Sequence, residues 1–385
     1  MISQNFKIGL FPLHTFVNPG GVKRHVLAVH KEFRDLGYSS LIAPPRRNKS
    51  EQYGEGIELF GRSRPLFSNG SEGDFTFCSG KSAESFLTRH NFDIIHFHNF
   101  GWHSFQILKK SKAVNVLSFH ANINLAKWGF FKLWPRSYRR FKKIINQNID
   151  GIIAPSTATF DNFSDFPGTK AVIPNGVDLS RFFPAPKALA RGQAPDYLTI
   201  LFLGRLEERK GLIYLLRAYQ LLKQKYSFLR LVIAGDGPER EKCEEFVEAR
   251  KLADVFFDGQ MSEELVPIFY RSCDIFVSPA VFGESFGMVL LEAMACGKPV
   301  VAFANEGYKE VLTGKGAEFL VEPKNWQELA EKIEILITSE QKRGEMGQWG
   351  IEQSKKYSWE VIAQETLSFY KRAAEWREKK RFLAH

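Results

Sequence analysis

The chain has 385 residues, of which 44% are hydrophobic and 25% charged, and its net charge is +10. The length predicts two or three domains of about 150 residues, and the composition excludes a disordered chain. No apolar run approaches the roughly 18 residues of a membrane span, and the N-terminal residues lack a signal-peptide pattern. We therefore expect a cytoplasmic protein, neither transmembrane nor secreted.

The positive charge is concentrated in the first half of the chain. Residues 1–190 contain 25 Lys and Arg against 13 Asp and Glu, whereas residues 191–385 contain 28 against 30. This asymmetry indicates an anionic partner for the first half, such as nucleic acid, a lipid surface or a phosphorylated ligand. The four cysteines, at positions 78, 243, 273 and 296, form no Cys-x-x-Cys pair, so we expect reduced thiols.

Short runs of Val, Ile, Leu and Phe recur along the chain without strict alternation, as is typical of parallel strands covered on both faces. In the first half, the predicted strands are Lys7–Phe11, Ser40–Ala43, Ile94–Phe97, Val114–Phe119, Gly151–Ala154 and Ala171–Ile173. In the second half, they are Thr199–Leu203, Arg230–Ala234, Val255–Phe257, Ile275–Val277, Pro299–Ala302 and Glu318–Val321. Amphipathic stretches such as Gly211–Lys225 separate many of them, which predicts doubly wound α/β domains.

The first predicted strand is followed by paired glycines, Gly20 and Gly21, and then by a helix. Glycines at such a place let the backbone approach a ligand, and the helix N-terminus offers amides to an anion. A plain tight turn is the alternative interpretation. The Gly-x-Gly-x-x-Gly spacing is missing, which disfavours a nicotinamide dehydrogenase.

Three histidines lie on the third and fourth predicted strands or directly after them. His120 ends an apolar strand and is a candidate functional residue, because ligands of open α/β sheets bind beyond the carboxyl ends of strands. His96 and His98 alternate along one strand and share a face. No third ligand is evident, so we interpret them as structural or cleft-lining residues rather than metal ligands.

The segment 127–143 holds seven basic residues, six aromatic residues and no acidic residue. One interpretation is a surface for an anionic membrane or acceptor, since aromatic rings enter the headgroup region and cations attract acidic lipids. The alternative is a helix with a packed aromatic face and a solvated basic face. Pro135 is expected to divide the segment into a loop and a helix.

The stretch Arg181–Pro195 is rich in proline and alanine and lacks apolar periodicity, which predicts a domain boundary. We expect a first Rossmann-like domain at residues 1–185 and a second at residues 196–360. Residues from Trp359 onward are predicted to be helical. Two tandem doubly wound domains suggest a ligand site in the cleft between them.

The second domain opens with a strand, the loop Gly204–Gly211 and a helix. Arg205 and Lys210 lie in this loop, at the carboxyl end of a strand, where a diphosphate would need cations. Solvated side chains in a charged loop are the alternative. Gly235, after the next strand, permits a sharp turn and is interpreted as shaping the wall of the site.

The segment Pro279–Ala295 leads from a strand through a glycine-containing loop into an apolar helix. Glu292 lies among apolar residues, where an unpaired acid is costly to bury, and Glu284 lies in the loop. The amides of residues 286–288 would point out of the helix N-terminus. Two carboxylates suit a ligand rich in hydroxyl groups, since each accepts hydrogen bonds from a diol. A surface acid beside a helix-face acid is the alternative.

Together these segments resemble the retaining glycosyltransferases of family 4 (glycosyl transferases group 1), which have the GT-B fold. The resemblance covers nearly the whole chain, and its motifs appear in the family's order. They are Gly20-Gly21, the strand at 93–96, His120, the turn at 173–178, Gly204-Arg205 with Lys210-Gly211, the turn at 235–238, and the Glu-x7-Glu of Glu284 and Glu292. The helix after Trp359 is similar to the family's C-terminal helix, so we expect residues 361–385 to pack on the first domain.

The resemblance implies that Arg205 and Lys210 bind the diphosphate of a UDP- or GDP-sugar, while Glu284 and His120 contact the donor sugar. These four are the implied catalytic residues. The implied donor-binding residues are Gly20, Gly21, Gly204, Gly235, Phe286, Gly287, Met288 and Glu292. Cations and helix N-termini would stabilise the departing nucleoside diphosphate, and the chain has no Asp-x-Asp motif, so neither a metal nor another cofactor is expected.

The implied reaction moves a hexose, with retention, to a glycan or lipid-linked acceptor in cell-envelope polysaccharide or glycolipid synthesis, with the enzyme in the cytoplasm or peripheral on the membrane. One departure concerns the donor: Asn305–Glu310 replaces the family's Gly-Gly or Gly-Ala turn before Pro-Glu. The alternatives are a nucleotide-sugar epimerase or hydrolase, and a basic nucleic-acid-binding protein. The latter leaves the two glutamates unexplained, and no nucleic-acid partner is expected.

Overall fold

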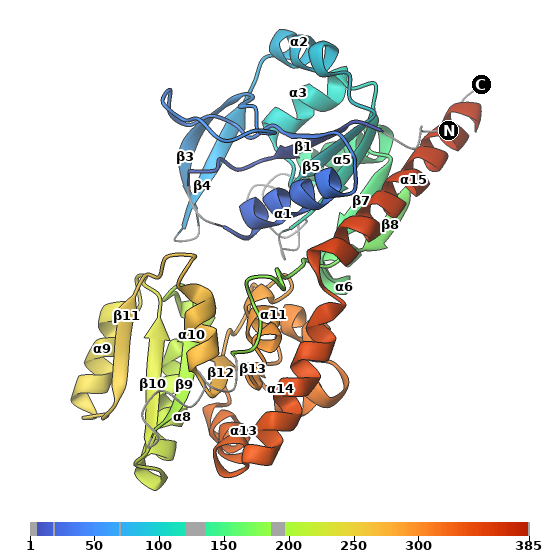
Figure 1. Ribbon diagram of the computed structural model, residues 1–385. Helices are drawn as coiled ribbons and strands as arrows, with labels where there is room; N and C mark the ends of the chain where they lie inside the picture. The colour runs from blue at the N-terminus through green and yellow to red at the C-terminus, as the bar shows by residue number, and fades with distance from the viewer. Residues whose placement is uncertain (1–5, 18–19, 69–70, 121–134, 186–196, 384–385) are drawn as a thin grey trace. The chain divides into compact units, whose positions relative to one another are not determined.

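The computed structural model describes residues 6–17, 20–68, 71–120, 135–185 and 197–383, which form two compact units (Figure 1). Unit 1 consists of residues 1–175 together with 359–385, and unit 2 of residues 176–358. The change of unit precedes the proline-rich stretch that suggested a boundary, because Val177 and Phe182 are buried in the core of unit 2.

Unit 1 is built on a parallel six-stranded sheet with the order β2-β1-β5-β6-β7-β8. Its strands are β1 (Ile8–Pro12), β2 (Ser40–Ile42), β5 (Ile94–His98), β6 (Val114–Ser118), β7 (Gly151–Ala154) and β8 (Thr169–Val172). Its helices are α1 (Gly21–Asp35), α2 (Gly80–His90), α3 (Trp102–Lys110), α5 (Pro135–Asn148), α6 (Thr157–Phe160) and α15 (Trp359–Leu383). The strands β1, β5 and β6 are buried throughout, as their apolar runs indicate.

An antiparallel hairpin in unit 1, formed by β3 (Arg62–Ser68) and β4 (Ser71–Phe77), was not predicted. Its strands have few consecutive apolar residues, and Pro65 inside β3 argues against a strand on local grounds. The pairing between β3 and β4 therefore overrides the local sequence signal.

Unit 2 has a second parallel six-stranded sheet, with the order β11-β10-β9-β12-β13-β14. The strands are β9 (Leu198–Leu203), β10 (Leu229–Ala234), β11 (Val255–Gly259), β12 (Ile275–Ser278), β13 (Val300–Phe303) and β14 (Leu320–Val321). The helices are α8 (Leu212–Lys225), α9 (Arg240–Ala249), α10 (Val266–Ser272), α11 (Met288–Ala295), α12 (Glu306–Val311), α13 (Trp326–Thr338) and α14 (Glu340–Lys355). All twelve predicted strands are thus present, which confirms the doubly wound α/β class.

Both sheets reverse their strand order beside their first strand. In unit 1, β1 lies between β2 and β5, and in unit 2, β9 lies between β10 and β12. Open α/β sheets bind ligands outside the carboxyl ends of the strands at such reversal points. The segments that follow β1 and β5 in unit 1, and β9 and β12 in unit 2, are therefore the places to look for a site.

Helix α15 follows unit 2 in the sequence but belongs to unit 1, where it contacts α1, β6, β7 and β8 (Figure 1, red). The hydroxyl of Tyr370 lies 2.7 Å from Nδ1 of His96 in the buried core. A Cβ at Gly151 would lie 2.7 Å from the ring of Phe369, so the glycine lets the helix approach the sheet. Among the described residues, no helix is long and apolar enough to span a bilayer.

Candidate functional site

In unit 2, the loops that follow β9 and β10 lie directly against each other. The amide of Gly204 donates to the carbonyl of Ala234, and the amide of Leu206 donates to that of Asp236. A Cβ at Gly235 would lie 1.9 Å from the carbonyl oxygen of Gly204. Glycine is therefore required at position 235, where it lets these two loops pack together.

The loop after β9 carries a set of paired ionic side chains, which we call the charged cluster: Arg205, Glu207, Arg209, Lys210 and Glu284. Oε1 of Glu284 accepts from Nζ of Lys210 at 2.7 Å and from Nη1 of Arg209 at 2.8 Å. Glu207 joins the two arginines, with 3.0 Å to Nε of Arg205 and 2.7 Å to Nε of Arg209. The predicted residues Lys210 and Glu284 thus meet directly, and Arg205 joins them through the other two.

The charged cluster keeps an excess of one positive charge. Its three cations face two carboxylates, and the side chain of Arg205 remains 52% exposed. Burial works to raise the pKa of Glu284, but Lys210 and Arg209 outweigh it and hold the pKa below its ordinary value. Glu284 is therefore ionised near neutral pH, and the exposed guanidinium of Arg205 can turn to an anionic ligand.

Helix α11 begins where the sequence predicted an anion-binding turn. Gly287 is its N-cap residue and has a φ of 119°, a conformation that favours glycine. Met288 starts the helix, and the ring of Phe286 is buried beside it. Glu292 lies inside the helix, 3% exposed, and accepts a hydrogen bond from the hydroxyl of Tyr270 at 3.1 Å. The buried acid therefore has the polar partner that its apolar surroundings require.

The segment that departs from the family pattern forms the short helix α12, packed against the Glu284 loop. A Cβ at Gly307 would lie 2.5 Å from the carbonyl oxygen of Glu284 and 2.7 Å from the amide nitrogen of Phe286. The side chain of Asn305 caps the helix and donates to the carbonyl of Ala280 at 2.8 Å. Tyr308 is fully buried, with its hydroxyl 2.7 Å from that of Ser278. The unusual segment therefore supports the loop that holds Glu284.

In unit 1, the paired glycines lie at the start of α1. Gly20 is the N-cap residue in an extended conformation, and Gly21 is the first helical residue. A Cβ at Gly20 would meet no atom of the described chain within 4 Å, so internal packing does not explain this glycine. The preceding loop is held by Asp74 of β4, which accepts from the amide of Thr15 at 2.9 Å and from Nη2 of Arg47 at 2.6 Å.

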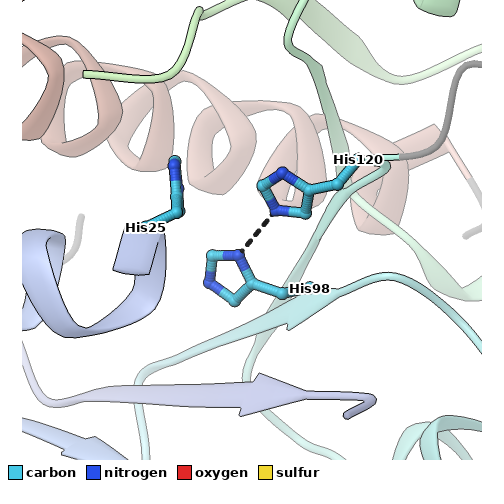
Figure 2. Close-up of side chains that lie close together, drawn as sticks. All are labelled: His25, His98 and His120. Carbon is cyan, nitrogen blue, oxygen red and sulfur yellow. Dashed lines mark hydrogen bonds between the residues drawn. The ribbon is translucent and has the colours of Figure 1, made fainter. Parts of the chain in front are cut away.

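Three histidines of unit 1, which we call the histidine cluster, gather at the reversal point of its sheet: His25, His98 and His120 (Figure 2). His25 is in the second turn of α1, His98 ends β5, and His120 follows the end of β6. Nδ1 of His98 lies 3.1 Å from Nε2 of His120, with the rings almost parallel. The ring of His25 lies 4.9 Å from that of His120 and 5.3 Å from that of His98, centroid to centroid.

The histidine cluster is neutral at physiological pH. Burial lowers the pKa of His25 to about 4, against a smaller opposing effect of Asn175. Burial, and then the neighbouring imidazoles, lower the pKa of His98 and of His120 well below the ordinary value. His96 stands apart, because both of its ring nitrogens are paired, with the hydroxyls of Tyr370 and Ser118. The interpretation of His96 as a structural residue therefore fits. His98 instead lies beside His25 and His120, a grouping that the sequence did not reveal.

The described part of the basic aromatic segment is the start of α5, which begins at Pro135 as expected, while residues 127–134 lie outside the described residues. Tyr138 and Phe141 pack against the core of unit 1. The exposed basic side chains of the helix are Arg136, Arg139, Arg140 and Lys143. In α5 the aromatic face is thus packed and the basic face solvated.

Sequence reasoning missed three contributors to these sites. Arg209 and Glu207 lie between the predicted Arg205 and Lys210, and their alternation of charge was the only available signal. His25 lies five residues after Gly20, and nothing local links it to His98 or His120.

Similarity to solved structures defines the class of the fold. Sucrose-phosphate synthase from Thermosynechococcus elongatus matches with a TM-score of 0.76 at 21% identity, over 99% of this chain and 100% of that one. HepE from Anabaena, in complex with UDP, matches with a TM-score of 0.75 at 23% identity, over 94% and 99%. The two Rossmann-like units are thus those of the GT-B glycosyltransferases.

Sequence comparisons give the family. Residues 19–181 match the model of Glycosyltransferase Family 4, and residues 189–353 match that of Glycosyl transferases group 1. The phosphatidyl-myo-inositol mannosyltransferase of Mycolicibacterium smegmatis is 30% identical over 373 residues, 94% of this chain and 93% of that protein. The protein of the same name from Propionibacterium freudenreichii is 30% identical over 322 residues, 80% and 79% of the two chains. The chain belongs to glycosyltransferase family 4, which confirms the predicted resemblance.

Proposed function

We propose that this glycosyltransferase moves a hexose, with retention, from a nucleoside diphosphate sugar to a lipid-linked acceptor in glycolipid synthesis. The observation that carries the proposal is the charged cluster, with its excess positive charge at the reversal point of the unit 2 sheet. A diphosphate is the ligand that such a group of cations, followed by a helix N-terminus, would bind. Relatives named as mannosyltransferases support mannose as the first sugar to test.

In the proposed reaction, the bond between the anomeric carbon and the diphosphate breaks, and the acceptor oxygen bonds to the same face of that carbon. The acceptor proton leaves with the nucleoside diphosphate. Negative charge grows on the departing diphosphate, where Arg205 and Lys210 would stabilise it. These cations supply the charge that a divalent metal would otherwise provide, so no metal is assigned to the reaction.

Glu284 has the role of positioning the donor sugar. Its carboxylate is ionised and fixed by Lys210 and Arg209 through one oxygen, Oε1. An ionised carboxylate accepts hydrogen bonds from sugar hydroxyls. Glu292 is assigned to the ribose hydroxyls, and His120 to the donor sugar, as the family resemblance implies.

The acceptor assignment rests on the names of the relatives and on α5. The solvated basic face of α5, formed by Arg136, Arg139, Arg140 and Lys143, would attract an anionic lipid surface by about 1 kcal/mol for each cation near it. We propose that the enzyme works at the cytoplasmic face of a membrane, held peripherally by this charge. Binding to anionic vesicles that falls as salt rises is expected, and the absence of binding at low salt would contradict the membrane assignment.

The test of the reaction is release of nucleoside diphosphate from a panel of UDP- and GDP-sugars, with inositol phospholipids and other lipids as acceptors. We expect release from one donor that requires an acceptor and is not lowered by EDTA. The anomeric configuration of the product, read by proton NMR, tests retention.

The informative variant is Glu284→Gln, which keeps the shape of the side chain and removes its charge. Its matched control is Glu334→Gln, because Glu334 also accepts hydrogen bonds from a lysine, Lys225, but lies on α13. We expect loss of transfer only in the first variant. Release without any acceptor would instead support an epimerase or hydrolase, and equal activity of both variants would remove Glu284 from the site.

A further inference from the structure

We propose that the histidine cluster, His25, His98 and His120, is a binding site for a zinc-like transition metal ion. The three side chains each bring a ring nitrogen to one place, and these nitrogens lie within 4.8 Å of one another (Figure 2). The metal would be separate from the proposed transfer chemistry, which assigns none. The site would inhibit the enzyme, and only this last consequence rests on the proposed function.

The fold brings the three residues together from distant parts of the chain. His98 is paired with Ser118 in the parallel register of β5 and β6, so His120 lies two residues beyond that pair, after the end of β6. The amide of His120 donates to Oδ1 of Asn99 at 2.8 Å, which fixes its backbone. Helix α1 follows β1, which pairs with the other side of β5, and its second turn carries His25.

The distances approach those of a metal centre. Two imidazole nitrogens bound to one tetrahedral zinc ion, at about 2.0 Å to 2.1 Å each, lie about 3.3 Å apart. Nδ1 of His98 and Nε2 of His120 are 3.1 Å apart, so this pair needs almost no movement. The remaining adjustment falls on His25, whose ring nitrogen lies within the 4.8 Å limit of the other two.

The hydrogen-bonding inventory of the histidine cluster is incomplete, which is a second and independent observation. Nδ1 of His25 and Nε2 of His98 are buried and have no hydrogen-bond partner among the described residues. Buried polar atoms are normally paired, and each exception calls for an explanation. In a metal complex, one nitrogen of each ring is bound by the ion. For His98 the short distance to His120 selects Nδ1, so of the two unpaired atoms only Nδ1 of His25 supports the site.

The ligand atoms of the histidine cluster favour a metal ion of intermediate softness. Imidazole nitrogen suits zinc, copper, cobalt and nickel, whereas magnesium and calcium prefer oxygen ligands. His25 and His98 are buried and His120 is partly exposed, so three protein ligands and one open position are expected.

A bound metal would hold His120 away from any other partner. His120 is the residue of unit 1 that the proposed function assigns to the donor sugar, so occupancy would inhibit transfer. Chelation would then restore activity, and EDTA would never lower it. The activity of the enzyme would thus fall as the concentration of available metal rises.

The direct experiment is a titration of the metal-free full chain with Zn²⁺ in competition with a chromophoric chelator, without donor or acceptor. We expect one Zn²⁺ per chain and no displacement by Mg²⁺. His25→Gln and His98→Gln should each weaken binding by more than about 100-fold, since losing even a hydrogen-bond partner of a ligand costs about 10- to 100-fold. Failure of Zn²⁺ to bind, or binding that both variants retain, would overturn the site.

The matched control is His103→Gln. His103 is also a buried histidine of unit 1, and burial lowers its pKa to about 4 as it does for His25, but it lies against Phe60. This variant should keep full zinc affinity. Circular dichroism identifies any variant that fails to fold.

X-ray absorption of the zinc-loaded wild type needs no variant. Nitrogen ligands at about 2.0 Å support the site, whereas sulfur ligands would assign the metal to cysteine and overturn it. Because binding is measured without substrate, an inactive enzyme would contradict the proposed function alone. If zinc is bound by these ligands but transfer is not inhibited, the metal site is supported and its inhibitory role is contradicted.

Discussion

The histidine cluster of unit 1 and the charged cluster of unit 2 occupy the same topological position in their sheets, but the first is neutral and the second is ionised. Both lie at the carboxyl ends of strands where the strand order reverses. In unit 2, every carboxylate of the charged cluster has a cationic partner, and Glu284 is held ionised. In unit 1, burial keeps three imidazoles neutral and leaves two ring nitrogens unpaired.

This difference teaches that one scaffold position does not determine one chemistry. A charge survives partial burial only when partners are near, and the loop after β9 supplies them from neighbouring residues in the sequence. Burial and the neighbouring imidazoles both disfavour a charge in the histidine cluster, so neutrality is its stable state. Unit 2 is thus suited to an anion, and unit 1 to a sugar hydroxyl or a metal ion.

The largest expected effect is on the charged side of the comparison. Lys210→Met removes a cation from Glu284 and from the proposed diphosphate site, and should lower kcat/KM by about 10²- to 10³-fold. The control is Lys225→Met, because Lys225 pairs with Glu334 on the surface of unit 2. If both variants keep wild-type kcat/KM, the charged cluster does not bind the donor.

The two clusters are expected to lose stability over different ranges of acidic pH. A histidine with a folded pKa of about 4 contributes full stability above pH 6.5 and loses it as the pH falls toward 4, because the unfolded chain binds the proton first. For His25, this loss is about 2 kcal/mol between pH 7 and 5. Because the pKa of Glu284 is lowered, its contribution to the unfolding free energy is lost only when the pH falls below the ordinary glutamate pKa of 4.5.

Urea unfolding of the wild type, His25→Gln and His103→Gln at pH 7 and pH 5 measures the difference. Both variants should show a smaller pH dependence of the unfolding free energy, by about the same amount, since burial lowers the pKa of both histidines to about 4. An unchanged pH dependence in His25→Gln would mean that His25 is not held neutral by the fold.

Arg209 sharpens the comparison within the charged cluster. It positions Glu284 and links it to Glu207, but Lys210 remains as a partner when it is lost. Arg209→Gln should lower kcat/KM about 10-fold, the cost of one charged hydrogen bond, and should move the acidic limb of the pH profile upward as the pKa of Glu284 rises. Arg209→Lys should restore both in part, and a pH profile identical to the wild type would contradict the positioning role.

The smallest expected effect on stability belongs to Gly20→Ser. A side chain there meets no atom of the described chain within 4 Å, and serine is a favourable N-cap residue, so the unfolding free energy should change by less than about 0.5 kcal/mol. If a ligand approaches this backbone, KM for the donor rises. Gly344→Ser in α14 is the control, because that position is equally open. An equal KM for the donor in both variants would contradict the assignment of Gly20 to the donor site.

Local signals were sufficient for the twelve parallel strands, although the edge strands β8 and β11 are only partly buried. They failed for the β3–β4 hairpin, where Pro65 and polar residues hide the strand pattern. Lys210 and Glu284 were predicted as separate candidates, but their ion pair joins positions 74 residues apart. The histidine cluster could not be assembled from sequence, because His98 and His120 meet through the register of β5 and β6, and His25 joins them through the position of α1.

Helix α15 has a consequence for how the protein is made. Ribosomal synthesis delivers the strands of unit 1 first, yet Tyr370 and Phe369, which complete its core at His96 and Gly151, are added after all of unit 2. Unit 1 therefore stays incomplete until α15 is synthesised, whereas unit 2, which is contiguous in the sequence, has all of its residues before then. The core of unit 1 can therefore be completed only after unit 2 has been translated, and we expect the incomplete first unit to be the part most in need of a chaperone.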